Sequence, residues 1–506
     1  MKILPVYKIR EADEYTILHE PIAAIDLMER AAMACFSWLI NNISPDKNIK
    51  VFCGTGNNGG DGMVIARLMA ARGNSTEVYI IGQEAKFTSN CGTNYGRLLQ
   101  NPSVQSHFIA ENSALPVLSK DCDVVIDALI GSGLSEPAKG LLSKVIDHLN
   151  GSQSLTISID VPSGLFSDET MADHPKSSVV HADHTLTFAP LKLAFLFPEN
   201  DPYVGNRHLL EIGISQEFID QTETRNYYLQ PEDIRPLLKS RNLYSHKGHF
   251  GHALLICGST GKMGAAVLSA RSSLRAGAGL VSVHIPREGN VILQTAVPEA
   301  MVDLDESESI FSCVGDLTPY NSIAIGPGIG RAPETRRALK HLVQNTGIPI
   351  IFDADAITIL GENKTWISFI PKGSILTPHP KEFERLAGKT NNHFERNKVQ
   401  RDFSIKYGVY IILKGAHTAI TTPDGTCYFN STGNPGMATG GSGDVLTGIL
   451  AALKAQRYSS LETCLIGTYI HGLAGDFAAA EKGQEAMIAG DITENLGKAF
   501  LSIHDL

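Results

Sequence analysis

The feature that most constrains this chain is the alternation of short, β-branched apolar runs with longer segments of helical periodicity. Such alternation is typical of parallel sheets whose strands are joined by crossover helices, so we expect an α/β fold. The runs of the first part lie at 49–53, 77–81, 123–129, 155–160 and 185–188. Those of the second part lie at 253–257, 280–285, 322–325, 349–352, 374–377 and 409–413. Several runs end at Gly or Asp, at the carboxyl edge where α/β sheets bind ligands.

The two series of runs are separated by a polar stretch at 215–249. A chain of 506 residues suggests two to four domains, at roughly 150 residues each. We therefore predict two domains, 1–225 and 226–506. Their glycine-rich segments differ from each other, so the halves do not look like duplicates.

Composition narrows the class of protein. There are 43 Lys and Arg against 53 Asp and Glu, a net charge of −10, which disfavours a general binder of nucleic acids or membrane surfaces. Apolar residues make up 43% and charged residues 19%, which excludes global disorder. We find no C-x-x-C pair among the eight cysteines, no signal-peptide core and no membrane-spanning apolar stretch. These features predict a soluble protein of the reducing cytoplasm.

A glycine-rich turn follows the first predicted strand. Its sequence is Gly-Thr-Gly-Asn-Asn-Gly-Gly-Asp-Gly over 54–62, and apolar residues at 64, 65, 68 and 69 then predict a helix. Such a turn directs backbone N–H groups and the positive end of a helix dipole toward an anion. A tight turn without a ligand is the plain alternative, but Asn57, Asn58 and Asp61 add three oxygen-bearing side chains. No acidic residue ends the second strand, so this is not the dinucleotide-binding pattern.

Two further aspartates close predicted strands, and each precedes a turn of Ser and Gly: Asp127 follows 124–126, and Asp160 follows 157–159. A carboxylate there is often only a turn former. The presence of two such aspartates, at the ends of two strands, favours a shared polar pocket. Asn58, Asp127 and Ser163 offer hard oxygen ligands, which suit an alkali or alkaline-earth cation better than zinc.

In this order, the motifs Asn-Asn-Gly-Gly-Asp-Gly, Asp-Ala-x-x-Gly-Ser-Gly and Asp-x-Pro-Ser-Gly resemble the NAD(P)H-hydrate epimerase family over about residues 1–220. The resemblance implies a Rossmann-like fold, interconversion of the R and S forms of hydrated nicotinamide cofactor at C6, and a K⁺ site at Asn58, Asp127 and Ser163. We expect acid–base catalysis from Asp61 or Asp160, with Asp127 as a further candidate. The residues implied to contact the cofactor are Asn57, Asn58, Gly59, Gly60, Asp61, Gly131, Ser132, Gly133, Leu134, Ser135, Glu136, Pro137 and Asp160.

A second glycine-rich turn lies near the end of the chain, with the sequence Thr-Gly-Gly-Ser-Gly-Asp over 439–444 and an apolar helical pattern after it. The N–H groups of 440–443 are then at a helix N-terminus, where they can stabilise a transferring phosphoryl group. Asp444 lies beside them and can accept the proton of a hydroxyl that attacks phosphorus. A capping Asp is the plain alternative, but this run of Gly and Ser is longer than a cap needs.

This turn resembles that of the ribokinase-like superfamily. Together with Lys-Gly-Ala-His-Thr at 414–418, Thr-Pro-His-Pro-Lys-Glu at 377–382 and Gly-Pro-Gly-Ile-Gly at 326–330, it resembles the ADP- or ATP-dependent NAD(P)H-hydrate dehydratases over about 226–506. The resemblance implies ADP (or ATP) with Mg²⁺ as the phosphoryl donor. The residues implied to contact the hydrated cofactor are Ala265, Gly328, His379 and Asp444. Those implied to hold the nucleotide are Lys414, Gly415, Ala416, His417, Thr418 and Gly443.

The two resemblances predict one repair sequence. The epimerase would supply the S form, and the dehydratase would phosphorylate its C6 hydroxyl, with Asp444 as base, so that NAD(P)H returns with release of AMP and phosphate. The expected partners are hydrated NADH and NADPH (NADHX and NADPHX) and ADP, with no nucleic acid or membrane, and a homo-oligomer is expected. Two alternatives are a ribokinase-like small-molecule kinase with an appended nucleotide-binding domain, and a first half that senses nucleotides or RNA.

Overall fold

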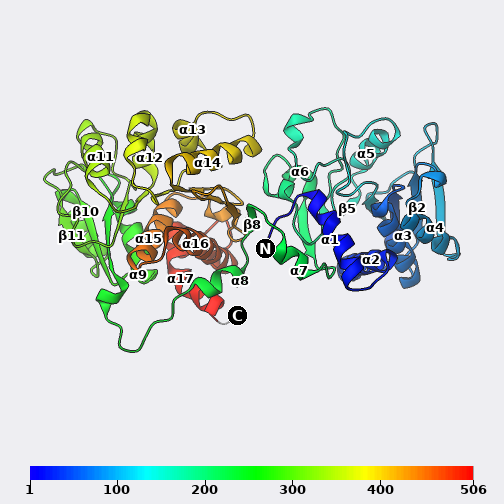
Figure 1. Cartoon of the computed structure of the whole chain (residues 1–506), viewed down its shortest axis with the longest axis horizontal. Helices are drawn as coiled ribbons and strands as arrows, with labels where there is room; N and C mark the ends of the chain where they lie inside the picture. The colour runs from blue at the N-terminus through cyan, green and yellow to red at the C-terminus, as the bar shows by residue number, and fades with distance from the viewer. Residues whose placement is uncertain (505–506) are drawn as a thin grey trace. The chain divides into compact units, whose positions relative to one another are not determined.

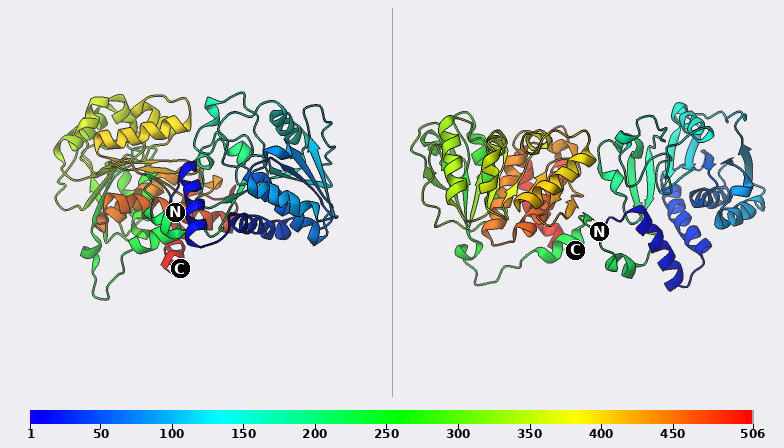
Figure 2. Two further views of the ribbon diagram at one scale, coloured as in Figure 1. Left: turned by 45° about the vertical axis from the view of Figure 1, so that its right-hand side comes forward. Right: turned by 45° about the horizontal axis from the view of Figure 1, so that its top comes forward.

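The computed structural model describes residues 1–504, which divide into two compact units. The first unit comprises 2–224 with 392–394, and the second comprises Met1, 225–391 and 395–506. In each unit, helices cover both faces of one sheet (Figures 1 and 2). The predicted α/β class is confirmed.

The sheet of the first unit has seven strands, all parallel, in the order β3-β2-β1-β4-β5-β6-β7. Its first six positions follow the Rossmann order, with the switch point between β1 and β4. All five strands expected from the apolar runs are present, and β3 and β7 were not expected. The bounds are β1 (Asn48–Cys53), β2 (Thr76–Ile81), β3 (Val104–Ile109), β4 (Asp123–Ala128), β5 (Leu155–Ile159), β6 (His184–Phe188) and β7 (Asn206–Leu210).

Both faces of this sheet are buried under helices. Val51 belongs to the core beneath α2, α3 and α4, and its neighbour Phe52 to the core beneath α5, because successive side chains of a strand point to opposite faces. This is why the strands read as continuous apolar runs. The helices are α1 (Val6–His19), α2 (Ala24–Asn42), α3 (Asn57–Arg72), α4 (Ser89–Leu99), α5 (Leu141–Ser152), α6 (Asp201–Val204) and α7 (Gln216–Gln221).

The second unit has a ten-stranded sheet in the order β11-β10-β9-β12-β13-β14-β15-β16-β17-β8. From β11 to β15 the strands are parallel, β16 is antiparallel to both of its neighbours, and β8 pairs with β17 in parallel. The six expected strands correspond to β9, β10 and β12–β15. The bounds are β8 (Asn226–Tyr228), β9 (His252–Ile256), β10 (Leu280–Ile285), β11 (Met301–Leu304), β12 (Ser322–Ile325), β13 (Ile350–Phe352), β14 (Ile375–Leu376), β15 (Tyr410–Leu413), β16 (Ala419–Thr421) and β17 (Cys427–Phe429).

The helices of the second unit form a layer on each side of its sheet (Figure 1). Helices α9 and α15 pack closely at Gly448, where a Cβ would lie 2.1 Å from both Ser269 O and Ser272 Oγ. Only glycine permits this approach, which holds the middle of α15 against α9. The bounds are α8 (Pro231–Ile234), α9 (Met263–Arg275), α10 (Asn290–Ala296), α11 (Pro333–Asn345), α12 (Ala354–Glu362), α13 (Pro380–Ala387), α14 (His393–Tyr407), α15 (Ser442–Ala455), α16 (Ser460–Lys482) and α17 (Ala489–His504).

Two sequence expectations are met by features of the whole chain. All eight cysteines are free, and most of them are buried among apolar residues. None of the helices in the described range combines the length and the apolarity that crossing a membrane requires.

Candidate active sites

A pocket of about 550 Å³ lies at the carboxyl edge of the first sheet. The turns after β1, β4 and β5 line it, and helix α1 contributes one wall. The pocket thus lies at the switch point between β1 and β4, as expected for an open α/β sheet. Among the predicted residues, the lining includes Asn57, Asn58, Asp61, Gly131, Ser132, Gly133 and Asp160. Among the described residues, those predicted to contact the cofactor but absent from the lining are Gly59, Gly60, Leu134, Ser135, Glu136 and Pro137.

The glycine-rich turn is shorter than the sequence suggested. Helix α3 begins at Asn57, with Gly56 as its N-cap, so the Asn-Asn-Gly-Gly-Asp motif forms the opening of the helix rather than a loop before it. Gly59 has a packing role, because a Cβ there would lie 2.0 Å from Gly54 O. A Cβ on Gly54 would in turn lie 2.0 Å from Leu129 O. These contacts hold the helix start against the turn after β4.

Asp61 is a buried carboxyl with 8% of its surface exposed. Within residues 1–504, no group donates a hydrogen bond to its side chain. Burial raises the pKa of Asp61 well above its usual range, and the neighbouring carboxylates Asp160 and Asp13 raise it further. This shift favours the protonated form of Asp61, which suits the residue to donate a proton.

Asp160 forms a buried ion pair with Lys192, a residue that the sequence analysis missed. Lys192 is 2% exposed, and its Nζ also donates to Phe188 O at 2.8 Å and to Thr187 Oγ1 at 3.2 Å. The backbone of Asp160 is left-handed, with φ at 64°. The only sequence signal for Lys192 is a single Lys within the apolar stretch 189–197, which predicts a buried and therefore paired cation.

Asp127 lies below the pocket and does not line it. It is fully buried and accepts from Ser158 Oγ at 2.7 Å, Ser163 N at 2.9 Å, Leu129 N at 3.3 Å and Ser163 Oγ. Burial raises its pKa, and these hydrogen bonds oppose that shift. These four hydrogen bonds and its position outside the pocket argue against proton transfer between Asp127 and a ligand.

The three predicted K⁺ ligands meet around the segment after β4. Ser163 bonds Asp127, and its Oγ also accepts from Ile130 N at 2.9 Å. The terminal amide of Asn58 lies between Ile159 O and Gly131 N, 3.2 Å from each. Its oxygen is placed toward Ile159 O, so two oxygens face each other, an arrangement that a cation coordinates; rotation of the amide by 180° would instead give a hydrogen bond to each group. The oxygen donors therefore fit an alkali cation.

The second site lies at the carboxyl edge of β12–β15. Asp353 follows β13, is 1% exposed, and accepts from Lys414 Nζ and Thr447 Oγ1, at 2.8 Å each. A Cβ on Gly443 would lie 3.2 Å from Lys414 Nζ, so the ammonium group stands directly beside the glycine-rich start of α15. The structure thus brings together the predicted residues Lys414, Gly443 and Asp444. Asp353 was not predicted.

Asp444 lies in the first turn of α15 and is half-buried. Burial raises its pKa to about 6, with a further increase from Asp353 and Asp355 and an opposing decrease from Lys414. Within residues 1–504, its carboxylate has no hydrogen-bond partner. Asp444 is therefore mostly ionised at neutral pH and free to accept a proton.

The other predicted contacts of the second site form two groups. Gly328 lies against Ala265, since a Cβ on Gly328 would stand 3.2 Å from the Ala265 Cβ. Asp355 joins this group, because it accepts from Gly330 N at 2.9 Å and from Lys262 Nζ at 3.2 Å. The charge of Asp355 also raises the pKa of Asp444, which links this group to the Asp444 carboxylate.

His379 and the segment after β15 complete this edge. Nδ1 of His379 accepts from the N–H groups of Lys381 and Glu382, so the side chain caps α13. Burial and the charge of Lys414 lower the pKa of His379, which keeps it neutral. In the segment 414–418, Thr418 Oγ1 donates to Gly415 O at 3.0 Å, which closes a compact turn.

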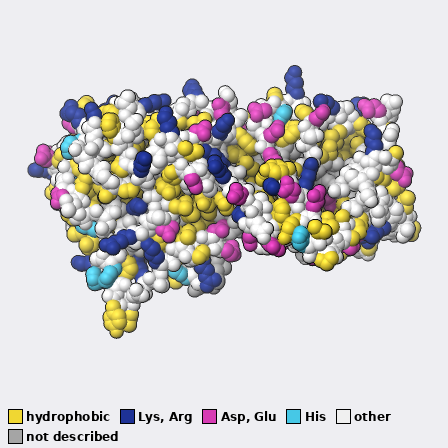
Figure 3. Space-filling view, in the orientation of Figure 1, with side chains coloured by type: hydrophobic (Ala, Val, Ile, Leu, Met, Phe, Trp, Pro, Cys, Tyr) yellow, Lys and Arg dark blue, Asp and Glu magenta, His cyan; other side chains and the backbone are white. Residues whose placement is uncertain are grey.

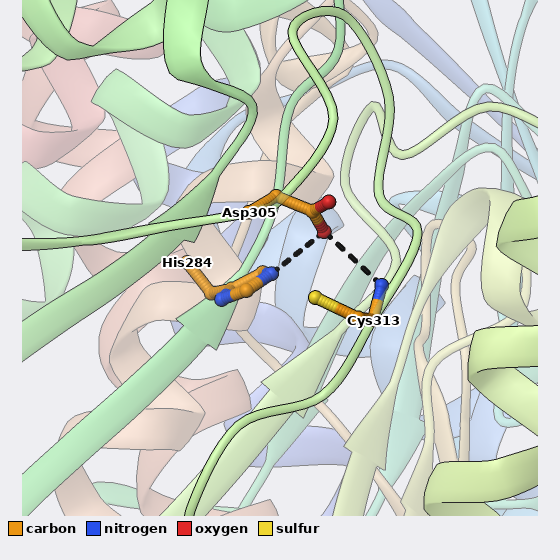
Figure 4. A group of neighbouring side chains, drawn as sticks. All are labelled: His284, Asp305 and Cys313. Carbon is orange, nitrogen blue, oxygen red and sulfur yellow. Dashed lines mark hydrogen bonds and ion pairs between the residues drawn. The ribbon is translucent and has the colours of Figure 1, made fainter.

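A third cluster lies apart from the predicted residues: His284, Asp305 and Cys313 have ligand atoms within 4.8 Å of one another (Figure 4). Both ring nitrogens of His284 face carboxylates, Asp303 at 2.8 Å and Asp305 at 2.9 Å. Asp305 also accepts from Ser312 and Cys313 N–H groups. Burial acts against ionisation, but these hydrogen bonds lower the pKa of Asp305. Because the ring nitrogens of His284 and the carboxylate of Asp305 already form hydrogen bonds within the protein, we interpret this cluster as structural.

Two family models match the chain. One described as YjeF-related protein N-terminus matches residues 24–194, and one described as NAD(P)H-hydrate dehydratase matches residues 253–498. The chain is similar to the bifunctional NAD(P)H-hydrate repair enzyme Nnr of Moorella thermoacetica, at 33% identity over 98% of this chain and 96% of the relative. Its counterpart from Escherichia coli is 34% identical over 93% of this chain and 88% of the relative.

Among solved structures, the chain is similar to the ADP/ATP-dependent NAD(P)H-hydrate dehydratase from Bacillus subtilis co-crystallized with ATP/Mg²⁺. That structure is 28% identical, covers 55% of this chain and 98% of its own, and has a TM-score of 0.49.

Proposed function

The chain belongs to the family of bifunctional NAD(P)H-hydrate repair enzymes, and from this premise we propose how its two sites divide the work. It is an isomerase and a lyase: it epimerises hydrated NADH and NADPH, and it dehydrates them with consumption of a nucleotide. Family membership sets aside the small-molecule kinase and the non-catalytic sensor. We assign epimerisation to 1–225 and dehydration to 226–506.

One observation carries this division: each unit holds its own unpartnered aspartate near the start of a glycine-led helix. Asp61 in the first unit is a buried carboxyl in a pocket, and its raised pKa favours the protonated form. Asp444 in the second is a mostly ionised carboxylate beside Lys414 and the N–H groups of α15. The first suits acid–base chemistry on a bound ring, and the second suits activation of a hydroxyl toward phosphorus.

In the proposed dehydration, Asp444 takes the proton of the C6 hydroxyl. The hydroxyl oxygen attacks the β-phosphorus of ADP at the same time, and AMP leaves. The N–H groups at 440–443 and Lys414 stabilise the charge that develops on the phosphoryl oxygens. The ring nitrogen then expels phosphate from C6, and loss of a C5 proton restores the dihydronicotinamide. Hydroxide is a poor leaving group, and phosphorylation removes that difficulty.

Mg²⁺ prefers oxygen ligands and keeps several waters, binding through one or two carboxylates and the phosphates of a nucleotide. The carboxylates of Asp353 and Asp444 beside the predicted nucleotide segment fit this requirement. When bound, Mg²⁺ would offset charge on the transferring group. We propose ADP rather than ATP as the donor, held by the segment 414–418 and Gly443.

In the first unit, we propose that K⁺ is held by Asn58, Asp127 and Ser163, where it would fix the turns that line the pocket. The hydrated ring is proposed to contact Asp61 and Asp160, and Gly131–Gly133 to contact the rest of the cofactor. The pocket lining supports these contacts.

We also propose that the protein acts in the cytoplasm as a homo-oligomer. Eight free cysteines are in keeping with a reducing compartment. A loop between 238 and 246 carries Leu243 and Tyr244, which are 89% and 90% exposed, and apolar side chains gather on a projecting loop of the second unit (Figure 3). Burial of this tip against another copy would remove apolar surface from water. Sedimentation of the wild type and of Tyr244→Ser tests this.

The proposed function is tested by mixing the purified chain with separated R and S epimers of hydrated NADH, with ADP, with ATP or with no nucleotide. Restored dihydronicotinamide is followed by absorbance, and the epimers by chromatography. We expect epimer exchange without nucleotide and restored NADH only with nucleotide, faster with ADP. A stable phosphorylated product would contradict the proposal.

A further inference from the structure

Helix α1 forms part of the first pocket, although no motif in the sequence marks it. Arg10 and Asp13, three residues apart and so on one face of the helix, both line the pocket. Ile9, Ala12 and Thr16 are buried beneath them and anchor the helix. Arg10 also lies close to the predicted cofactor loop, with Nη2 3.5 Å from where a Cβ on Gly133 would stand.

Asp13 has no partner within the part of the chain that the structure describes. No hydrogen bond or ion pair engages its half-buried carboxyl. The nearby cation, Lys192, is bound to Asp160, Thr187 and Phe188. A carboxyl that lines a pocket and binds nothing in the protein is available to a ligand.

The charges around Asp13 make it a competent proton carrier. Burial raises its pKa to about 6, the carboxylates of Asp160 and Glu14 raise it too, and Lys192 opposes them. Asp13 in turn raises the pKa of Asp61, which lies on α3 and lines the same pocket. With a pKa of about 6, Asp13 is mostly ionised near neutral pH, whereas the upward shift at Asp61 favours its protonated form.

We propose that Asp13 is a catalytic residue of the first pocket and exchanges a proton with the oxygen that leaves or joins C6 of the hydrated nicotinamide, in partnership with Asp61. This rests on the proposed function, which assigns epimerisation to the first unit. The other carboxylates do not fit the role: Asp127 is outside the pocket and bound by Ser158 and Ser163, and Asp160 is held by Lys192.

The proposed step balances as follows. The ring nitrogen forms a double bond to C6, the C6–O bond breaks, and the proton of Asp61 goes to the departing oxygen, which leaves as water. A water then adds to the opposite face of C6, the C–N double bond returns to the nitrogen as a lone pair, and Asp13 takes the released proton. One water leaves and one adds, so the proton has moved from Asp61 to Asp13. The reverse reaction exchanges their roles.

The test uses the full chain with Asp13→Ala, and Glu11→Gln as the matched control at an exposed position of the same helix. Epimerisation of the R epimer of hydrated NADH is measured without nucleotide, and dehydration of the S epimer with ADP in the same preparation. We expect Asp13→Ala to lose at least about 10²-fold in kcat for epimerisation and to keep dehydration, and Glu11→Gln to keep both. Added formate should restore part of the lost rate, because it supplies a carboxylate where the side chain was removed.

If Asp13 had only a structural role, added formate would not restore the epimerisation rate of Asp13→Ala. Epimerisation by Asp13→Ala within threefold of wild type overturns the proposal, as does a loss that formate leaves unchanged in both Asp13→Ala and Asp13→Gly. If the alanine variant does not fold, Asp13→Asn takes its place, and a rate within threefold of wild type again overturns the proposal. If Asp61→Asn lacks epimerisation and Asp13→Ala has it, the proposal fails while the proposed function stands. Absence of epimerisation in the wild type overturns both.

Discussion

The two units each place an aspartate near the start of a helix that follows a glycine-rich turn: Asp61 in α3 and Asp444 in α15. In both, burial is the largest influence and raises the pKa. The neighbours differ. Around Asp61 stand the carboxylates Asp160 and Asp13, whereas Asp444 stands near Lys414, which opposes the increase.

The position of one lysine in each unit explains the difference. Lys192 in the first unit is bound to Asp160, and the charges that act on Asp61 are carboxylates, which favour its protonated form. Lys414 in the second is bound to Asp353 but stands beside the start of α15, where it opposes burial and Asp353, and the pKa of Asp444 is about 6. The same residue type in similar local structure is thus suited to act as an acid in one unit and as a base in the other.

The largest expected effect is that of Asp444→Asn. An amide cannot accept the hydroxyl proton, so dehydration should fall by about 10³-fold, within the usual range for a lost general base. Epimerisation should be unchanged, because the first site has its own carboxyls. Both rates are measured on one preparation. Dehydration near the wild-type rate would remove Asp444 from the role of base, and loss of both activities would contradict independent sites.

Asp61→Asn tests the proposed acid of the first unit. The amide is nearly the same size and can still donate a hydrogen bond, but it cannot give up a proton. We expect epimerisation to fall by about 10²-fold and dehydration of the S epimer to be retained. The rate of R-to-S conversion, followed by chromatography, checks this. An unchanged rate would show that the protonated carboxyl has no catalytic part.

Lys414→Met removes the cation that distinguishes the two aspartates. The pKa of Asp444 should rise, so at pH 6 kcat/KM for dehydration should drop by about fivefold for the first unit of increase and by about tenfold for each further unit. The loss should be smaller at pH 8, where Asp444 ionises again. Lys364→Met, an exposed lysine on the same unit, is the control. A loss equal at both pH values would assign Lys414 to nucleotide binding alone.

The smallest effect concerns the turn that positions Asp61. Gly59→Ala should destabilise the protein by about 1–3 kcal/mol, since its Cβ would lie 2.0 Å from Gly54 O. Gly56→Ala, three residues earlier, meets nothing within 4 Å and should be neutral. Thermal denaturation of the two variants compares them. Equal midpoints would contradict the tight packing at the start of α3.

Much of this architecture could be predicted from the sequence, because buried parallel strands such as β1 and β4 read as unbroken apolar runs. In the first sheet the strands that were missed, β3 and β7, lie at the two edges and mix polar with apolar residues, as Val104–Ile109 shows. In the second sheet β8, β11, β16 and β17 were missed, and of these β8 and β11 are the edge strands. An edge strand buries less of its surface, so its pattern carries less information.

The site was predicted only where a motif is local in the chain. The glycine-rich turns marked Asp61 and Asp444, but Asp13, Lys192 and Asp353 come from segments with no motif of their own. Their roles arise from tertiary contacts, which join residues far apart in the chain. For the same reason, the sequence could not show that Asp127 is enclosed by hydrogen bonds while Asp160 faces the pocket.

The most direct test of the contrast between the two aspartates is the pH dependence of dehydration, measured as kcat/KM for the S epimer with saturating ADP. Burial and Asp353 hold the pKa of Asp444 at about 6 against the pull of Lys414, and the base must be ionised to act. We predict a rate that climbs tenfold per pH unit below 6 and levels off above it, with the bend moved to higher pH in Lys414→Met. A rate that declines as the pH passes upward through 6, or a bend that does not move in the variant, would contradict the account.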